Sequence, residues 1–148
     1  MSPATPTRAR IVSEARAWIG TPYHHQASLC GTGTDCLGLV RGLYRALYGH
    51  EPEPAPAYSP DWAEADGADP LLDAARRHLI EIPATSARHG DVLLFRWRRG
   101  RAAKHLAIIS APDRMIHAIE GAPVCEVALS PWWRRHVAAA FAFPGVQD

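Results

Sequence analysis

The sequence lacks the features of several protein classes. It holds three cysteines, an odd number without paired close spacings, which excludes a full disulfide framework and a four-cysteine zinc site. Its longest uncharged apolar runs, such as residues 137–146, are far shorter than the roughly 18 residues of a membrane-spanning helix. Charged side chains interrupt any apolar segment near the N-terminus, so we expect no signal peptide. These side chains are Arg8, Arg10, Glu14 and Arg16.

Neither sign of charge dominates the chain. The formal net charge is +1, which is too small to indicate binding to nucleic acid. Hydrophobic residues make up 47% and charged residues 21%, the balance of a folded globular protein. With a length of 148 residues, we expect a single domain over 1–148.

The first half of the chain has the spacing of helices. Apolar residues predict a helix over 11–19, followed by a loop at 21–34. A second helix is expected from an N-capping Asp35 to Gly49, and a third from Asp69-Pro70 to about residue 79. The proline-rich residues 50–60 indicate an extended surface segment that could bind a partner.

The second half has the pattern of strands. They are predicted at residues 91–97, 105–110, 115–119, 124–129 and 137–143, with a hairpin turn at 98–101 and a short helical turn at 131–136. Helices followed by consecutive strands predict an α+β fold, with N-terminal helices packed on an antiparallel β-meander.

Cys36 is the first candidate for chemistry. It follows the N-cap Asp35, so its thiol lies in the first turn of a helix, where the dipole favours a thiolate. Backbone N–H groups at the same helix end could hold an oxyanion. A buried cysteine that packs as a small apolar side chain is the structural alternative.

Two histidines could complete a nucleophilic site. His105 begins one predicted strand and His117 lies in the middle of the next, so the two could face each other. A nucleophilic thiol needs a base, and that base needs a group that fixes its tautomer. We therefore expect His105 to take the proton of Cys36 and His117 to orient His105.

Five motifs in this order resemble the NlpC/P60 family of cell-wall cysteine peptidases, from about residue 8 to residue 144. They are Gly20-Thr21-Pro22-Tyr23, Thr34-Asp35-Cys36-Leu37-Gly38-Leu39-Val40, Gly90-Asp91-Val92-Leu93-Leu94-Phe95, Lys104-His105-Leu106-Ala107-Ile108 and Met115-Ile116-His117-Ala118. Two further segments, Tyr23-His24-His25-Gln26 and residues 140–144, are similar to the branch found in tails of phages and gene transfer agents. The family usually has Ser where this chain has Leu37.

The resemblance implies a papain-like fold with Cys36 as nucleophile, His105 as base and His117 as the orienting residue. It implies hydrolysis of amide bonds in peptidoglycan stem peptides, typically between D-γ-glutamyl and diaminopimelyl or lysyl residues. Tyr23 and Asp35 would bind the start of the stem peptide, although each has a structural alternative, as core cover and as helix cap. No metal and no cofactor is implied.

The same resemblance implies a place of action. We expect synthesis in the cytoplasm, transport on the tail of a phage-like particle, and action at the periplasmic cell wall of the target cell. The expected partners are the stem peptide and tail-tip or baseplate proteins, without nucleic acid or membrane insertion.

Two other functions remain open at this point. One is a catalytically weak structural adaptor or plug at the tail tip. The other is a zinc amidase that uses His105, His117 and Cys125 as ligands. His24 and His25 beside Cys30 could also suggest a metal site, but loop histidines more often shape a cleft. The basic hairpin before His105 could attract cell-wall carboxylates or an acidic tail protein; its charged residues are Arg96, Arg98, Arg99, Arg101 and Lys104.

Overall fold

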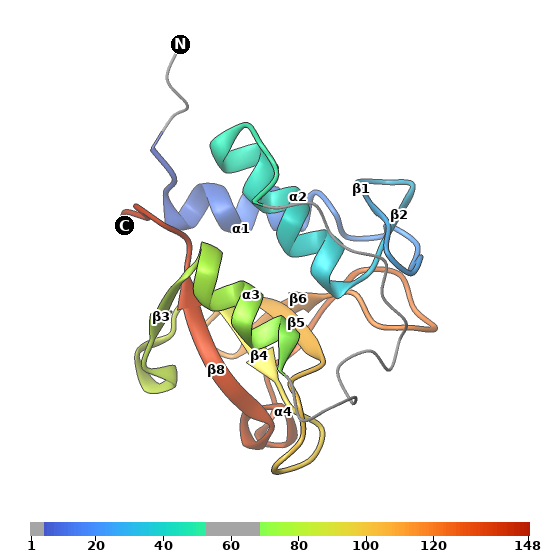
Figure 1. The fold of residues 1–148 in the computed structure, drawn as a ribbon. Helices are drawn as coiled ribbons and strands as arrows, with labels where there is room; N and C mark the ends of the chain where they lie inside the picture. The colour runs from blue at the N-terminus through green and yellow to red at the C-terminus, as the bar shows by residue number, and fades with distance from the viewer. Residues whose placement is uncertain (1–4, 53–68) are drawn as a thin grey trace.

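The computed structural model describes residues 5–52 and 69–148, and most of the proline-rich segment 50–60 lies outside these residues. The helices are α1 (Arg8–Arg16), α2 (Cys36–Tyr48), α3 (Pro70–His78), η2 (Ala84–Ser86, a 3₁₀ turn) and α4 (Pro131–Arg135). The strands are β1 (Ser28–Leu29), β2 (Gly33–Thr34), β3 (Ile80–Ile82), β4 (Val92–Phe95), β5 (His105–Ala111), β6 (Arg114–His117), β7 (Cys125–Ala128) and β8 (Val137–Ala142). The helices precede most of the sheet along the chain (Figure 1), which confirms the predicted α+β class.

The main sheet has six antiparallel strands within the described residues, in the order β3-β8-β4-β5-β6-β7. Strands β4 to β7 follow one another as the predicted meander. The last strand, β8, returns to lie between β3 and β4 and pairs with both. The loop predicted over 21–34 contains a short hairpin, β1-β2, because Ser28 pairs with Thr34 and Leu29 with Gly33.

Helix α2 forms as its end signals predict. The side chain of Asp35 accepts a hydrogen bond from the backbone N–H of Gly38, and Gly49 ends the helix with a φ of 82°. Helix α1 begins earlier than predicted because Thr7 caps it by accepting a bond from the N–H of Arg10. Trp18 lies beyond this helix but is still buried in the core.

The core lies on both faces of the sheet. Helices α1, α2 and α3 cover one face, where they pack on Val92 and Leu94 of β4. Leu93 and Phe95 of the same strand pack on the other face against Trp133 of α4. All four residues of β4 are therefore buried, which fixes this strand and its neighbour β5 firmly in the domain. Among the described residues, no helix is long and apolar enough to cross a membrane.

Candidate active site

Cys36 is the first residue of α2 and faces the beginning of β5. Its Sγ atom lies 4.0 Å from the carbonyl oxygen of Lys104, the residue that precedes His105. Helix α2 packs directly on β5, so the tertiary fold brings the thiol beside the first residues of that strand. The side chain of Cys36 is half-buried.

The surroundings of Cys36 do not favour the thiolate in the free protein. Burial raises the pKa of this thiol to about 12, and the neighbouring Asp35 carboxylate acts in the same direction. Backbone N–H groups of Leu106, Leu37 and Cys36 itself lower the pKa but are outweighed. The backbone at the helix end thus lowers the pKa of Cys36, as expected. The expectation of a low pKa is nevertheless wrong, because desolvation raises the pKa by more.

His105 and His117 form a buried pair across β5 and β6. Nε2 of His105 lies 2.9 Å from Nδ1 of His117, and each residue is 3% exposed. Burial, followed by the proximity of His117, lowers the pKa of His105 to about 3. Burial also lowers the pKa of His117. Both rings are therefore neutral near pH 7, and one donates its N–H to the other.

Aromatic rings enclose His105 on several sides. The ring of Trp97 stacks on it at a centroid distance of 5.5 Å and an angle of 24°. Trp133 lies 5.7 Å away and Phe95 5.8 Å away. The sequence analysis did not include Trp97 in the site. The pairing of strands β4 and β5 could have indicated it. Phe95 pairs with His105, so the residues that follow β4 pass close to the same histidine.

One pocket collects most of the predicted site residues. Tyr23, Asp35, Cys36 and His105 line it together, whereas His117 lies behind His105 and is not part of its wall. Trp97, Lys104 and Glu120 also line it, together with Leu37 and Leu71. The pocket volume is about 200 Å³. The structure thus assembles the predicted residues, while their catalytic and binding roles stay predictions.

Tyr23 and Asp35 line the pocket together with Cys36. One oxygen of Asp35 accepts a bond of 2.7 Å from the N–H of Gly38, and the other accepts one of 2.8 Å from the N–H of Gln26. Asp35 therefore caps α2 and also fixes the preceding loop. Burial, with the nearby charges of Cys36, Asp35 and Glu120, raises the pKa of Tyr23 to about 12. Its phenol stays protonated and can donate a hydrogen bond to a substrate.

The suggested metal ligands are not grouped. In the described part of the chain, no three His, Cys, Asp or Glu side chains stand close enough to hold a metal ion. Cys125 pairs with His117 across β6 and β7, but a third donor is not placed with them there. The exposed thiol of Cys30 donates a hydrogen bond of 3.3 Å to the carbonyl of Ala17.

A cysteine at the start of a helix that shares a pocket with a histidine of an antiparallel sheet is the arrangement of the papain-like α+β class. The model of one such family, described as the NlpC/P60 family, matches residues 20–141. The chain belongs to the NlpC/P60 family.

Solved structures share this fold. The NlpC/P60 domain of the peptidoglycan hydrolase SagA is 25% identical with a TM-score of 0.64, over 93% of this chain and 99% of that one. An NlpC/P60 family protein from Bacillus cereus is 20% identical (TM-score 0.69), over 94% of this chain but 41% of its own. The peptidoglycan hydrolase RipB from Mycobacterium tuberculosis is 18% identical (TM-score 0.59), over 95% and 65%. This chain therefore spans less than half of the Bacillus cereus protein. No protein of curated function matches it significantly.

Proposed function

We propose that this protein is a cysteine peptidase that hydrolyses amide bonds in peptidoglycan stem peptides, between D-γ-glutamyl and diaminopimelyl residues. The observation that carries the proposal is the shared pocket of Cys36 and His105, with His117 hydrogen-bonded behind the base. Two proteins of similar structure, SagA and RipB, are peptidoglycan hydrolases. Family membership and the thiol site together favour this reaction class.

The first half of the reaction follows from the neutral pair. Nε2 of His105 is occupied by His117, so Nδ1 is the nitrogen left to take a proton from Cys36. The sulfur attacks the amide carbonyl as its proton moves to His105, because neither charged form is stable in the empty pocket. N–H groups of Cys36 and Leu37, which already face the sulfur, would hold the oxyanion.

The second half releases both products. The protonated His105 gives its proton to the leaving amine, the C–N bond breaks, and a thioester to Cys36 remains. His105 then takes a proton from a water molecule, whose oxygen attacks the thioester. Collapse of this intermediate breaks the C–S bond, forms the carboxylic acid and returns the proton to Cys36. The phenol of Tyr23 and the carboxylate of Asp35 would orient the acyl part of the substrate from their end of the pocket.

We place this activity on the tail of a phage or gene transfer agent particle. The support is the sequence similarity of residues 23–26 and 140–144 to that branch of the family. The protein would be made in the cytoplasm, bind tail-tip or baseplate proteins, and act at the periplasmic cell wall of the target cell. Mass spectrometry of purified particles tests this placement. We expect the protein to be present at a fixed copy number per tail. A free periplasmic form of the protein that is absent from particles would contradict the placement.

The cleaved bond is identified by its new ends. Purified peptidoglycan treated with the protein should release fragments with a free D-glutamyl carboxyl group and a new diaminopimelyl amine, identified by mass and amine labelling. New reducing sugar ends instead would show cleavage of the glycan and contradict the peptidase. No fragments of either kind, together with stable binding to a tail protein, would favour the structural adaptor.

A further inference from the structure

A second pocket adjoins the one that contains Cys36. It is lined by Trp97, Arg98, Arg101, Ala102 and Lys104, and has a volume of about 450 Å³. Trp97 and Lys104 line both pockets, so the two pockets adjoin at these residues, and His105 lines the first of them. At roughly 30 Å³ per water molecule, this volume is large enough for an amino-acid residue rather than only a small ion.

The two pockets differ in charge. Among the residues that the structure describes, the second pocket is lined by three cationic side chains and by no carboxylate. The first pocket carries Asp35 and Glu120 in its lining, besides the shared Lys104. Arg96, another arginine of the hairpin, does not line the second pocket and pairs with Asp69 at 3.0 Å. This ion pair anchors the hairpin to the start of α3, and the N–H of Ala103 donates to the same carboxylate at 3.1 Å.

The position of His105 indicates which pocket would receive the leaving group. The imidazole must protonate the leaving amine, so the leaving group must lie on its side of the thiol. Lys104 precedes His105 in the chain, and Trp97 stacks on its ring. Trp97, which lines the second pocket, therefore lies beside the proton donor, whereas Tyr23 and Asp35 line the first pocket and not the second.

We infer that Arg98 and Arg101, with Trp97 as one wall, form a subsite for a carboxylate carried by the leaving group of the substrate. This inference rests on the proposed peptidase function and names a chemical feature of its substrate. A guanidinium binds a carboxylate through two parallel N–H bonds, and the ring of Trp97 supplies an apolar surface for the carbon chain of the residue. Because both arginines are exposed, we expect a preference of about three- to tenfold rather than an absolute requirement.

Two matched peptides test the subsite. Both contain L-alanyl-γ-D-glutamyl joined to diaminopimelate, in one peptide with the carboxyl groups of the leaving residue free and in the other as carboxamides. The wild type should cleave the free acid about three- to tenfold faster in kcat/KM, and the difference should lie mainly in KM. The double variant Arg98→Gln/Arg101→Gln should lose this preference and cleave the two peptides with similar kcat/KM.

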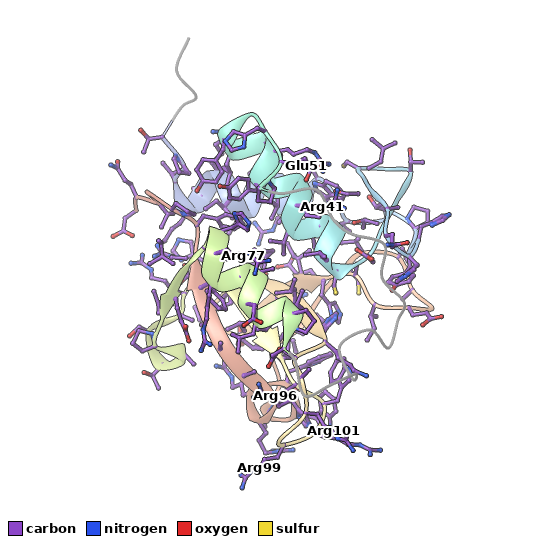
Figure 2. All side chains as sticks on the ribbon, in the orientation of Figure 1. Arg41, Glu51, Arg77, Arg96, Arg99 and Arg101 are labelled. Carbon is purple, nitrogen blue, oxygen red and sulfur yellow. The ribbon has the colours of Figure 1, made fainter. Side chains whose placement is uncertain are left out.

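Arg99→Gln is the matched control. Figure 2 shows Arg99 at the tip of the hairpin, pointing away from the domain, and it does not line the pocket. This variant loses the same kind of charge but should keep the preference, and thermal unfolding of each variant shows whether the fold is intact. If Arg99→Gln loses the preference for the free acid to the same extent, the preference comes from general attraction by the basic hairpin, and the inference is overturned. Equal cleavage of both peptides by the wild type would also overturn it, while the peptidase function would stand.

Binding separates failure of the subsite from failure of the peptidase. Calorimetric titration of Cys36→Ala with each peptide measures affinity without turnover. Tighter binding of the free acid, lost in Arg98→Gln/Arg101→Gln on the same background, supports the subsite even if no variant cleaves either peptide. Equal affinities for the acid and the carboxamide would contradict it.

Discussion

His105 and His117 are joined by a buried contact of 2.9 Å between Nε2 of the first and Nδ1 of the second. For Nδ1 of His105 to accept the proton of Cys36, the proton of the neutral ring must be on Nε2. His105 then donates to His117, which carries its own proton on Nε2 and accepts through Nδ1. The contact is compatible with this tautomer, in which His105 is a base toward the thiol as the proposed reaction requires.

The role of His117 as acceptor can be tested by substitution. His117→Ala removes the acceptor and should lower kcat by on the order of 10²-fold with little change in KM. His117→Gln keeps a side-chain oxygen that can accept the bond and should retain a larger part of the activity. Steady-state kinetics on a stem peptide measures both. Equal losses in the two variants would show that His117 acts through packing rather than through the hydrogen bond.

Acid should destabilise the fold through the same histidines. The pKa of His105 is about 3 in the folded protein and about 6.5 in the unfolded chain, so the unfolded chain binds more protons between these values. Stability falls as pH decreases below 6.5, and His105 alone should reduce the free energy of unfolding by about 2 kcal/mol between pH 8 and pH 5.

Urea unfolding at the two pH values measures this difference. His105→Gln should reduce the pH dependence by most of that amount, because the buried titratable ring is removed. His24→Gln is the matched control, since His24 is exposed, and it should retain the wild-type dependence. The same slope in His105→Gln as in the wild type would exclude the ring as the source.

Trp97 should control the pH range of activity. Burial is the main cause of the low pKa of His105, and Trp97 covers one face of its ring. Trp97→Ala admits water and raises the pKa of His105, so the acid limb of kcat/KM should move to higher pH. Trp132→Ala is the control, because Trp132 stacks on His136 at 4.0 Å and contacts the rings of Trp97 and Trp133 rather than that of His105. Superimposable pH profiles for the two variants would contradict this role.

Gly38 should be required for the geometry of the helix end. A methyl group at this position would overlap the backbone oxygen of Ala27 and lie 2.7 Å from Oγ1 of Thr34. Gly38→Ala should therefore cost about 1–3 kcal/mol, although alanine favours helices elsewhere. Thermal unfolding measures the loss, and activity should fall with it because the same turn holds Cys36. A stabilised and fully active variant would contradict the close packing.

Local signals in the sequence predicted much of this structure. The cap at Asp35 and the stop at Gly49 specify α2 because their hydrogen bonds lie within a few residues. The two histidines could be placed on neighbouring strands because only a short turn separates them. The insertion of β8 between β3 and β4 could not be predicted, because it depends on pairing between distant segments.

The chemistry of the site was harder to predict than its residues. The high pKa of Cys36 results from burial against β5, which begins 69 residues later in the chain. The residues around the start of the helix do not indicate this burial. The stacking of Trp97 on His105 likewise depends on the path of the chain after β4. The order of the five motifs nevertheless led to the family, and the matched family model confirms it.

The nucleophile is the central claim, and its most direct test is digestion of purified peptidoglycan by the wild type and by Cys36→Ala, each with and without a chelator. Cys30→Ala is the matched control, because it removes another thiol that does not line the pocket. The account predicts release of stem-peptide fragments by the wild type and Cys30→Ala, unaffected by the chelator, and none by Cys36→Ala. Fragment release that survives in Cys36→Ala, or that the chelator abolishes, would contradict it.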